Sequence, residues 1–435
     1  MATSLWRNWS GTEAVEPVRT VKPGKVNEIA AAVREAAADG LRVKAVGAGH
    51  SFSGIAAPEG VLVDMGDMDG VVRVDTETNV VTVEAGMPMW RLNKVLDAHG
   101  LALENMGDID RQTVSGAIST GTHGTGDRYR GLAWQVSALQ MVLADGAVVR
   151  CSPERRPELF AAARIGLGAL GIITEVSIQC VPAFQLQAVE TPMRLDAVLG
   201  GLDELVAEND HFEFYWFPHT ERTLTKQNNR YSMEERKRRP TRLEYWWNEG
   251  FTENALFEAS NRVGARFPQA VPSLNRLAGR VWSSRNYTDV SHRVFTSPRK
   301  VVFREMEYAV PREALAEVLR DLKARVDAGG FNVSFPVEVR FAAADDVWLS
   351  TAHGRKTAYV AVHQYHRHDY EEYFKAAAEI CNAVDGRPHW GKLHWLDAKG
   401  LSERYERFDD FLAVRDEVDP ERRFANSYLD RVLGA

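Results

Sequence analysis

The feature that most constrains this chain is the stretch from Val43 to Phe52, where a short apolar strand runs directly into Gly47, Gly49 and His50. Glycines placed after a strand let backbone N–H groups approach a diphosphate, because glycine adopts positive φ at no steric cost. A histidine has no part in that task. Beside a bound cofactor it would be a covalent tether or a proton carrier, and otherwise it is a polar loop residue bonded to backbone. The segment predicts a diphosphate-binding loop and leaves the role of His50 open.

Composition is typical of a globular protein that acts on a small molecule. The 435 residues suffice for about two to three domains, and 45% hydrophobic with 26% charged residues is ordinary for a folded chain. A net charge of −7 provides no general attraction to nucleic acid or to an anionic membrane. Three widely spaced cysteines, Cys151, Cys180 and Cys381, encode neither a disulfide framework nor a zinc site, and no metal is expected. Without a signal-peptide pattern or a window near the roughly 18 apolar residues of a membrane helix, we expect a cytoplasmic protein with no integral membrane segment.

The first part of the chain predicts an α+β unit of two small lobes. Its expected elements are a helix at 27–39, short antiparallel strands between 61 and 85, a helix at 89–98, a hairpin at 136–151 and a strand within 170–181. Pro182 closes the last of these strands. The character of the sequence then changes, so we place a domain boundary after residue 183.

The second part predicts an antiparallel sheet with helices on one face, of the split β-α-β type. Its expected elements are strands at 211–217, 301–309, 333–341 and 357–365, and helices at 312–328 and 370–384. No elements are assigned in the polar stretch 219–300. Within it we expect the charged run Glu234–Arg239 to form a solvated loop and Trp246-Trp247 to pack internally.

Alternation along these strands collects charge on one face of the sheet, because successive side chains point to opposite sides. Val337, Val339 and Phe341 share the face that suits the helices. The other face collects Glu305, Glu307, Glu338, Arg340 and His363. Pattern alone favours a solvated outer face for such a set, and a buried functional site is the alternative.

A second glycine-rich segment, Asn105–Gly126, is dense in small residues and hydroxyls. It contains neither a Walker A motif nor G-x-G-x-x-G, so it indicates neither an NTPase nor a Rossmann dinucleotide site. Small side chains let a planar ring lie against backbone, and hydroxyls can bond ring carbonyls. Two such loops suit a cofactor with a diphosphate and a flat heteroaromatic head.

These motifs together resemble a known family. The order Gly47-x-Gly49-His50-Ser51-Phe52, then Thr120–Gly126, then Gly168-x-x-Gly171-Ile172-Ile173 resembles the FAD domain of the vanillyl-alcohol oxidase superfamily. Phe335–Phe341 and Arg387–Lys392 narrow the resemblance to the aldonolactone oxidoreductases, with alditol oxidases as close relatives. The resemblance covers nearly the whole chain. It implies an FAD-binding domain at 1–183, a substrate-binding cap domain at 184–389, and a segment at 390–435 that returns to the flavin domain.

The resemblance also implies a set of cofactor contacts. FAD is expected to be covalent, attached through its 8α-methyl carbon to His50, a bond that raises the reduction potential of the flavin. The expected cofactor contacts are Ala45, Val46, Gly47, Ala48, Gly49 and Ser51 at the diphosphate, with Thr113, Ile118, Gly121, Thr122, His123, Gly124, Ile173 and His389 along the rest of the molecule.

For the substrate, the resemblance implies that Glu338, Arg340 and Lys392 are catalytic and hold a sugar lactone or polyol, with Thr113 and His363 as further contacts. Positive groups would stabilise the alkoxide formed as hydride leaves for flavin N5. Arg340 is a permanently charged planar donor, Lys392 would bind the hydroxyl, and Glu338 would orient Arg340; the general base stays open. Glu305 and Glu307 match no motif and are expected to be sheet surface.

The implied reaction is oxidation of an L-gulono-, L-galactono- or D-arabinono-1,4-lactone at the hydroxyl next to the carbonyl, yielding an ascorbate-type product. Gly107 matches a position where a larger residue blocks oxygen from the flavin, so O2 is permitted as electron acceptor beside other acceptors. The alternative is an alditol oxidase acting on xylitol or sorbitol. A more distant alternative is a flavin-free lactone hydrolase or sugar-binding protein.

Overall fold

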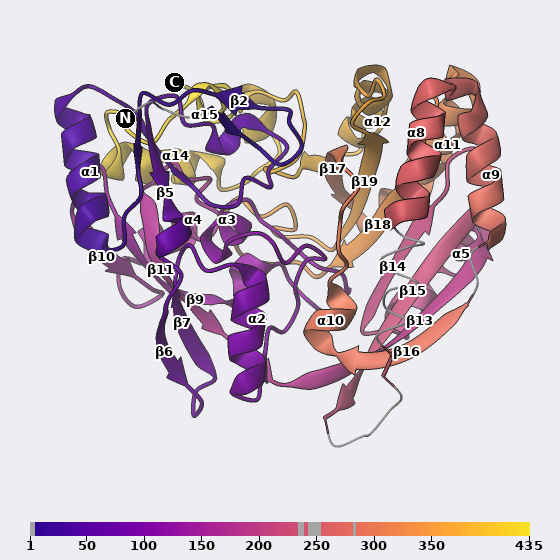
Figure 1. The fold of residues 1–435 in the computed structure, drawn as a ribbon, viewed down its shortest axis with the longest axis horizontal. Coiled ribbons are helices and arrows are strands. Elements are labelled where there is room, and N and C mark those ends of the chain that lie inside the picture. Colours follow the sequence, from indigo (N-terminus) through magenta and orange to yellow (C-terminus); the bar gives the residue numbers. More distant parts are fainter. Residues whose placement is uncertain (1–4, 234–238, 242–253, 282–283) are drawn as a thin grey trace.

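The computed structural model describes residues 5–233, 239–241, 254–281 and 284–435 of the chain. Two bodies lie next to each other, one built from the chain up to Pro182 together with the C-terminal segment, the other around a large sheet (Figure 1). Trp246-Trp247 and most of the run Glu234–Arg239 lie outside the described residues, so their expected packing is not addressed. No described helix combines the length and the apolar character of a membrane span.

The N-terminal body begins with a small parallel sheet. Strands β3 (Arg19–Val21), β4 (Val43–Val46) and β5 (Val61–Asp64) pair in the order β3-β5-β4, and helix α1 (Val26–Ala38) forms the crossover between β3 and β4. The expectation of antiparallel strands from 61 onward was therefore wrong for β5. A β-branched run reads the same in either pairing, and the long connection 47–60, which returns the chain to the start of the sheet, makes β5 parallel to β4.

The second sheet of this body is antiparallel, as expected, and has the order β10-β9-β11-β7-β6. The hairpin at Asp145-Gly146 is confirmed, with Gly146 at φ 78°. The strands and helices are β6 (Val71–Asp75), β7 (Val80–Glu84), α2 (Met89–Ala98), α3 (Val114–Ser119), β9 (Val136–Val142), β10 (Val148–Cys151), α4 (Pro157–Ala163) and β11 (Ile172–Gln179), with short pairs β1 (Trp6–Arg7)/β2 (Ala14–Val15) and β8 (Leu101–Ala102)/β12 (Val181–Pro182).

The second body is an eight-stranded antiparallel sheet in the order β16-β13-β15-β14-β18-β19-β17-β20. Its strands are β13 (Phe184–Arg194), β14 (His211–Trp216), β15 (Arg222–Ser232), β16 (Arg285–Val290), β17 (Phe303–Pro311), β18 (Val337–Ala342), β19 (Thr357–Tyr365) and β20 (Arg387–Pro388). The four expected strands are confirmed. Strands β15 and β16 went unpredicted because their polar composition hides strand periodicity. Strand β13 also went unassigned, although Phe184, Leu186 and Ala188 alternate along it and are buried.

Helices α11 (Leu315–Gly329) and α12 (Glu371–Asn382) cover one face of this sheet, and much of the other face lies against the first body. Val337, Val339 and Phe341 pack in one cluster with these helices, as the alternation predicted. The remaining helices of this body are α5 (Leu195–Gly200), α6 (Leu202–Ala207), α8 (Phe257–Arg266), α9 (Val271–Val281) and α10 (Ser291–Phe295).

The C-terminal segment returns to the first body. Its helices α13 (Ala398–Ser402), α14 (Phe408–Val418) and α15 (Ser427–Leu433), yellow in Figure 1, lie over the indigo N-terminal strands and loops. The Asn426 side-chain amide donates to the Gly54 carbonyl at 2.9 Å, and buried Lys44 on β4 donates to the Phe424 carbonyl at 2.8 Å. Trp390 packs in the core of the first body. The end of the chain thus brings residues 389–393 to the boundary between the two bodies.

Candidate active site

A cavity lies where β4 ends, and glycine backbone forms much of its wall. It is lined by Lys44, Ala45, Gly47, Ala48, Gly49, His50, Ser51, Ile55, Ala56, Met65, Gln112, Thr113, Ser115, Gly116, Ser119, Thr120, Leu167, Gly168, Gly171, Ile172 and Ile173. Gly49, Gly168 and Gly171 have φ of 67°, 64° and 153°, conformations that favour glycine. These backbones and the neighbouring hydroxyls fit the diphosphate and flat ring of a dinucleotide such as FAD.

Most of the predicted diphosphate contacts line this cavity. Ala45, Gly47, Ala48, Gly49, His50 and Ser51 do so, together with Thr113 and Ile173. Val46 and Ile118 are buried in the protein core instead. Gly121, Thr122, His123, Gly124 and His389 lie outside this cavity. The hydroxyls Ser115, Ser119 and Thr120, which sequence reasoning did not single out, do line it; their signal was the density of hydroxyls in residues 105–126.

His50 presents a neutral imidazole at the rim of this cavity. Its ring stacks on Trp9 with centroids 5.7 Å apart. Burial, reinforced by the positive charges of Lys392 and Arg111, lowers the pKa of His50 to about 4. At neutral pH the ring therefore keeps a free nitrogen lone pair, the form in which histidine acts as a nucleophile.

Arg340 lies at the centre of a buried cluster of carboxylates on the polar face of the large sheet. Its Nε lies 3.2 Å from Glu213 on β14, and its terminal NH2 nitrogen pairs with Glu338 and lies 3.3 Å from Asp108. Asp108 comes from the glycine-rich segment of the first body and also pairs with Arg299 at 2.6 Å. Within the described residues, the NH1 nitrogen of Arg340 enters no ion pair. That nitrogen is the part of the guanidinium available to a ligand.

Glu338 is held in the same cluster by its neighbour across the sheet. Tyr215 pairs with Glu338 in the β14–β18 register and donates a hydrogen bond from its hydroxyl to Glu338 at 2.9 Å. Burial raises the pKa of Glu338 above its ordinary value, although Arg340 opposes that effect. Asp108, Glu213 and Tyr215 were missed by sequence reasoning, because nothing local indicates that they meet Arg340.

Lys392 reaches this face of the sheet from the C-terminal segment. The backbone N–H of His389 donates to the Glu307 carbonyl, and that of Leu393 donates to the Glu305 carbonyl, each at 3.0 Å. The segment therefore follows the edge of β17 and brings Lys392 beside Glu305, where the ammonium and carboxylate form an ion pair. His363, the Cα partner of Glu305 on β19, lies 3.4 Å from the same carboxylate.

The expectation that Glu305 and Glu307 are surface residues was wrong. Both are buried, with exposed fractions of 3% and 4%. The polar sheet face is not solvated, because the first body and residues 389–393 cover it. Alternation identifies the face to which a side chain points but not what lies against that face.

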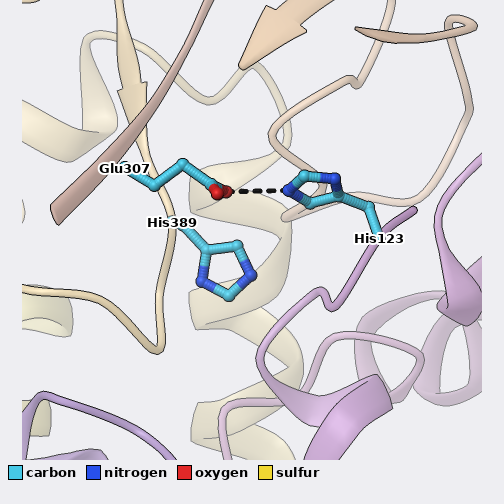
Figure 2. A group of neighbouring side chains, drawn as sticks. All are labelled: His123, Glu307 and His389. Carbon is cyan, nitrogen blue, oxygen red and sulfur yellow. Dashed lines mark hydrogen bonds and ion pairs between the residues drawn. The ribbon is translucent and has the colours of Figure 1, made fainter. Parts of the chain in front are cut away.

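Glu307 pairs with His123, and His389 lies beside them (Figure 2). The His123 Nε2 lies 2.7 Å from Glu307, and its Nδ1 lies 2.9 Å from the Gly124 carbonyl. Burial alone would raise the pKa of Glu307, but the His123 charge holds it well below its ordinary value. Both ring nitrogens of His123 therefore face acceptors, so backbone and carboxylate together fix the ring.

These three side chains have the composition of a metal site, since their ligand atoms lie within 4.8 Å of one another. Their hydrogen bonds describe a different arrangement. Both nitrogens of His123 are engaged, and the Nδ1 of His389 accepts a hydrogen bond from the Gly391 N–H at 3.0 Å. Burial is the main cause that lowers the pKa of His389, to about 4, so this second ring is neutral. The group is explained as an ion pair with a neutral histidine beside it.

The loop that carries His50 and the segment that carries Lys392 contact each other directly. The Phe52 N–H donates to the Gly391 carbonyl at 2.7 Å, and the Ser53 hydroxyl donates to the Trp390 carbonyl at 3.1 Å. A glycine-lined dinucleotide cavity therefore borders a buried sheet face with two cations. This arrangement is that of a flavin-dependent oxidoreductase, with an FAD-binding domain and a second domain built around the large sheet.

Comparisons with known proteins agree with that class and specify the family. Residues 17–152 match an FAD binding domain, and residues 176–432 match the D-arabinono-1,4-lactone oxidase family. The chain belongs to the aldonolactone oxidoreductases, which are FAD-linked enzymes acting on CH–OH groups.

Several curated relatives match over nearly their full length. The chain is 44% identical to an L-gulono-1,4-lactone dehydrogenase of Mycobacterium tuberculosis, covering 99% of each chain. It is 35% identical to the L-gulonolactone oxidase of Bos taurus over 98% of each, and 31% identical to an alditol oxidase of a Streptomyces species over 100% of each. A solvent-stable cholesterol oxidase shares the fold, with a TM-score of 0.84 at 18% identity, covering 100% of this chain and 98% of that one.

Proposed function

We propose that this enzyme oxidises a sugar-1,4-lactone, of the L-gulono-, L-galactono- or D-arabinono- type, at the hydroxyl carbon next to the lactone carbonyl. The product would be an ascorbate-type ene-diol. The observation that carries the proposal is a pair of cations, buried Arg340 and partly buried Lys392, on a sheet face that borders the glycine-lined cavity. The lactone dehydrogenase and oxidases among the relatives support this substrate class.

FAD, when bound, supplies the two-electron acceptor for the hydride that leaves the carbinol carbon. The residues that would hold it are the glycine-rich loop 45–51, Thr113 and Ile173 along the cavity, with His123 and His389 beyond it. The neutral, half-buried imidazole of His50 suits covalent attachment to the 8α-methyl carbon of the flavin. Such a bond would fix the ring relative to Arg340 and Lys392.

The cations act on the substrate by stabilising negative charge where it develops. Loss of the hydroxyl proton leaves an alkoxide, and preorganised donors in a buried site stabilise it far more than water does. The free NH1 nitrogen of Arg340 would donate to that oxygen, while Glu338 and Glu213 hold the guanidinium in place. Lys392 would bind the substrate hydroxyl, with His363 and Thr113 as further contacts.

The covalent bond has a simple test. Protein precipitated with acid should keep its yellow colour, and His50→Ala should release flavin into the supernatant. Release of all flavin from the wild-type protein would disprove the attachment. A colourless protein would favour the alternative of a flavin-free hydrolase or sugar-binding protein.

A substrate panel separates the lactone from the polyol alternative. Anaerobic flavin bleaching should be rapid with L-gulono-1,4-lactone or another of the three lactones and slow with xylitol or sorbitol. The reverse order would establish an alditol oxidase, an activity suggested by the Streptomyces relative.

We further propose that O2 is one electron acceptor, since Gly107 has no side chain to obstruct its path. Aerobic turnover should then release hydrogen peroxide. Reduction of cytochrome c or a dye without peroxide would show that O2 is not used. A cytoplasmic location fits the free, buried thiols Cys151, Cys180 and Cys381.

A further inference from the structure

Glu305 stands between two residues of the proposed substrate site and has no role in that site so far. One carboxylate oxygen pairs with the Lys392 ammonium, and the other lies 3.4 Å from Nε2 of His363. Its side chain is only 4% exposed. Burying a charged carboxylate this deeply costs free energy unless the charge is paired. The two partners offset that cost, but they do not by themselves give the carboxylate a function.

The backbone alone does not determine where the Lys392 ammonium lies. Hydrogen bonds to the edge of β17 place the Lys392 main chain, as described above. The ammonium, however, sits at the end of a flexible four-carbon stem with freely rotating donors. Its other described side-chain contact is with the Phe52 ring, whose centroid lies 5.2 Å from the ammonium. A ring face attracts the cation but does not orient its N–H bonds. The carboxylate of Glu305 is what fixes the ammonium.

The same carboxylate orients the His363 ring. His363 Nδ1 lies 3.1 Å from the Pro336 carbonyl, an acceptor, and the opposite nitrogen faces Glu305. The imidazole is therefore held at both ends, by backbone on one side and by Glu305 on the other. The register of the sheet makes this possible, because Glu305 and His363 are direct partners across β17 and β19.

We propose that Glu305 is a positioning residue, whose two carboxylate oxygens hold Lys392 and His363 in one fixed arrangement toward the substrate. The proposal rests on the function proposed above, in which Lys392 binds the reacting hydroxyl. Glu305 itself does not touch the substrate; it acts through the two side chains that do.

The charges around Lys392 indicate how the pH profile should respond. The groups facing it are Glu305 and Glu307 from β17, Asp108 from the first body, and the rings of His50, His363 and His389. Burial lowers the pKa of Lys392, but Glu305 foremost, with Glu307 and Asp108, outweighs burial and raises it above its ordinary value. Without the Glu305 charge, the ammonium loses its proton at lower pH, and the alkaline limb of kcat/KM shifts downward.

The test compares Glu305→Gln with Glu307→Gln, each alone and combined with Lys392→Met. Glu307 is the matched control because it lies on the same face of the same strand, equally buried, but pairs with His123. Glu305→Gln should lower kcat/KM roughly 10- to 100-fold, as loss of an orienting partner does. Combined with Lys392→Met it should add little, staying within about twofold of Lys392→Met alone. Glu307 has no direct ion pair with Lys392, so Glu307→Gln combined with Lys392→Met should show much weaker coupling, with a loss close to the product of the two separate losses.

Two further measurements test the positioning role of Glu305 if Glu305→Gln folds poorly. Glu305→Asp keeps the negative charge but moves the carboxylate oxygens away from Lys392 and His363 by the length of one methylene. Its kcat should therefore fall, while the alkaline limb of the kcat/KM pH profile stays in place. The dissociation constant of sulfite, read from flavin bleaching, should rise in Glu305→Asp because the Lys392 cation is no longer held at the site. Full activity of Glu305→Asp, or losses that multiply in the Glu305→Gln, Lys392→Met pair, would overturn the positioning role.

Lys392→Met alone tests the proposed substrate role of Lys392, on which the positioning role of Glu305 depends. If that variant keeps wild-type kcat/KM, the substrate role of Lys392 fails and the positioning role fails with it. If Lys392→Met is impaired but the losses multiply, only the role of Glu305 is wrong.

Discussion

Gly47 and Thr113 approach each other so closely that a Cβ on Gly47 would lie 2.2 Å from the Thr113 hydroxyl oxygen. The loop after β4 therefore touches the start of α3, where the same hydroxyl caps the helix by accepting from the Gly116 N–H at 3.3 Å. Both residues line the cavity in which we propose that FAD binds. The φ of Gly47 is not positive, so backbone conformation does not require a glycine here. The lack of space for a Cβ does.

Gly47→Ala should therefore reduce FAD binding. A methyl group at this position must displace Thr113, and with it the cap of α3 and one wall of the cavity. The ratio of flavin to protein absorbance after purification should fall severalfold. Gly200→Ala is the matched control, because nothing lies within 4 Å of the Cβ it would add, and it should keep full flavin content. Equal flavin content in both variants would contradict the close approach.

Glu307→Gln should weaken the acid sensitivity of the fold. The folded-state pKa of Glu307 lies below its ordinary 4.5 even though burial opposes this, because His123 holds it down. A group with a depressed pKa contributes stability that is present above its unfolded pKa and lost as pH falls through the folded pKa. At pH 7 the free energy of unfolding of the variant should be lower than that of the wild type by about 1–3 kcal/mol. Below pH 4.5 the variant should lose less of that free energy than the wild type does.

Thermal unfolding of the holoenzyme from pH 7 downward measures this difference. Exposed Glu317 on α11 provides the control, since Glu317→Gln removes an equal charge without a buried partner. A Glu307→Gln curve parallel to that of the wild type would show that the His123 pair contributes nothing to acid sensitivity.

Arg340→Lys should lose activity although it keeps the charge. A lysine cannot pair with Glu213, Glu338 and Asp108 at once and still offer a donor to the substrate, because it lacks the planar fork. We expect kcat/KM to fall on the order of 10²-fold, the scale of losing one donor to a developing oxyanion. Steady-state kinetics with the best lactone gives the value, and exposed Arg320 provides the matched change, Arg320→Lys, with no effect expected. Retention of kcat/KM in Arg340→Lys would mean that charge alone suffices.

Gly107→Ala should slow reaction with oxygen more than reaction with a dye. A Cβ on Gly107 would lie 3.0 Å from the Thr122 methyl and 3.3 Å from the His123 carbonyl, so it fills the remaining space there. Gly131→Ala adds a methyl beside the same two residues at 3.6 Å or more, an ordinary contact, and should change neither rate. Stopped-flow reoxidation by O2, set against dye reduction, gives the comparison. A parallel fall of both rates in Gly107→Ala would point to general distortion instead of blocked oxygen.

Much of the fold was predictable because local patterns encode it. The alternation of Val337 and Val339 with Glu338 and Arg340 indicated which sheet face packs on helices, and that face does so. Strand β15 escaped prediction because its polar sequence has no apolar face, and its pairing with β13 and β14 defines it. Strand β5 was recognised as a strand, but its parallel pairing with β4 depends on the course of the connection 47–60, which strand periodicity does not encode.

The sequence by itself determined the elements that nearest neighbours along the chain specify: the glycine-rich loop with His50, the strand periodicities and the family resemblance. Only the tertiary structure decided which charges meet. Asp108 reaches Arg340 and Lys392 reaches Glu305 because two bodies and a returning C-terminal segment close over one sheet face. The physical reason is that periodicity records the direction of a side chain, whereas burial and ion pairing depend on residues distant in sequence that cover it. For that reason Glu305 and Glu307, expected at the surface, are buried and paired in the structure.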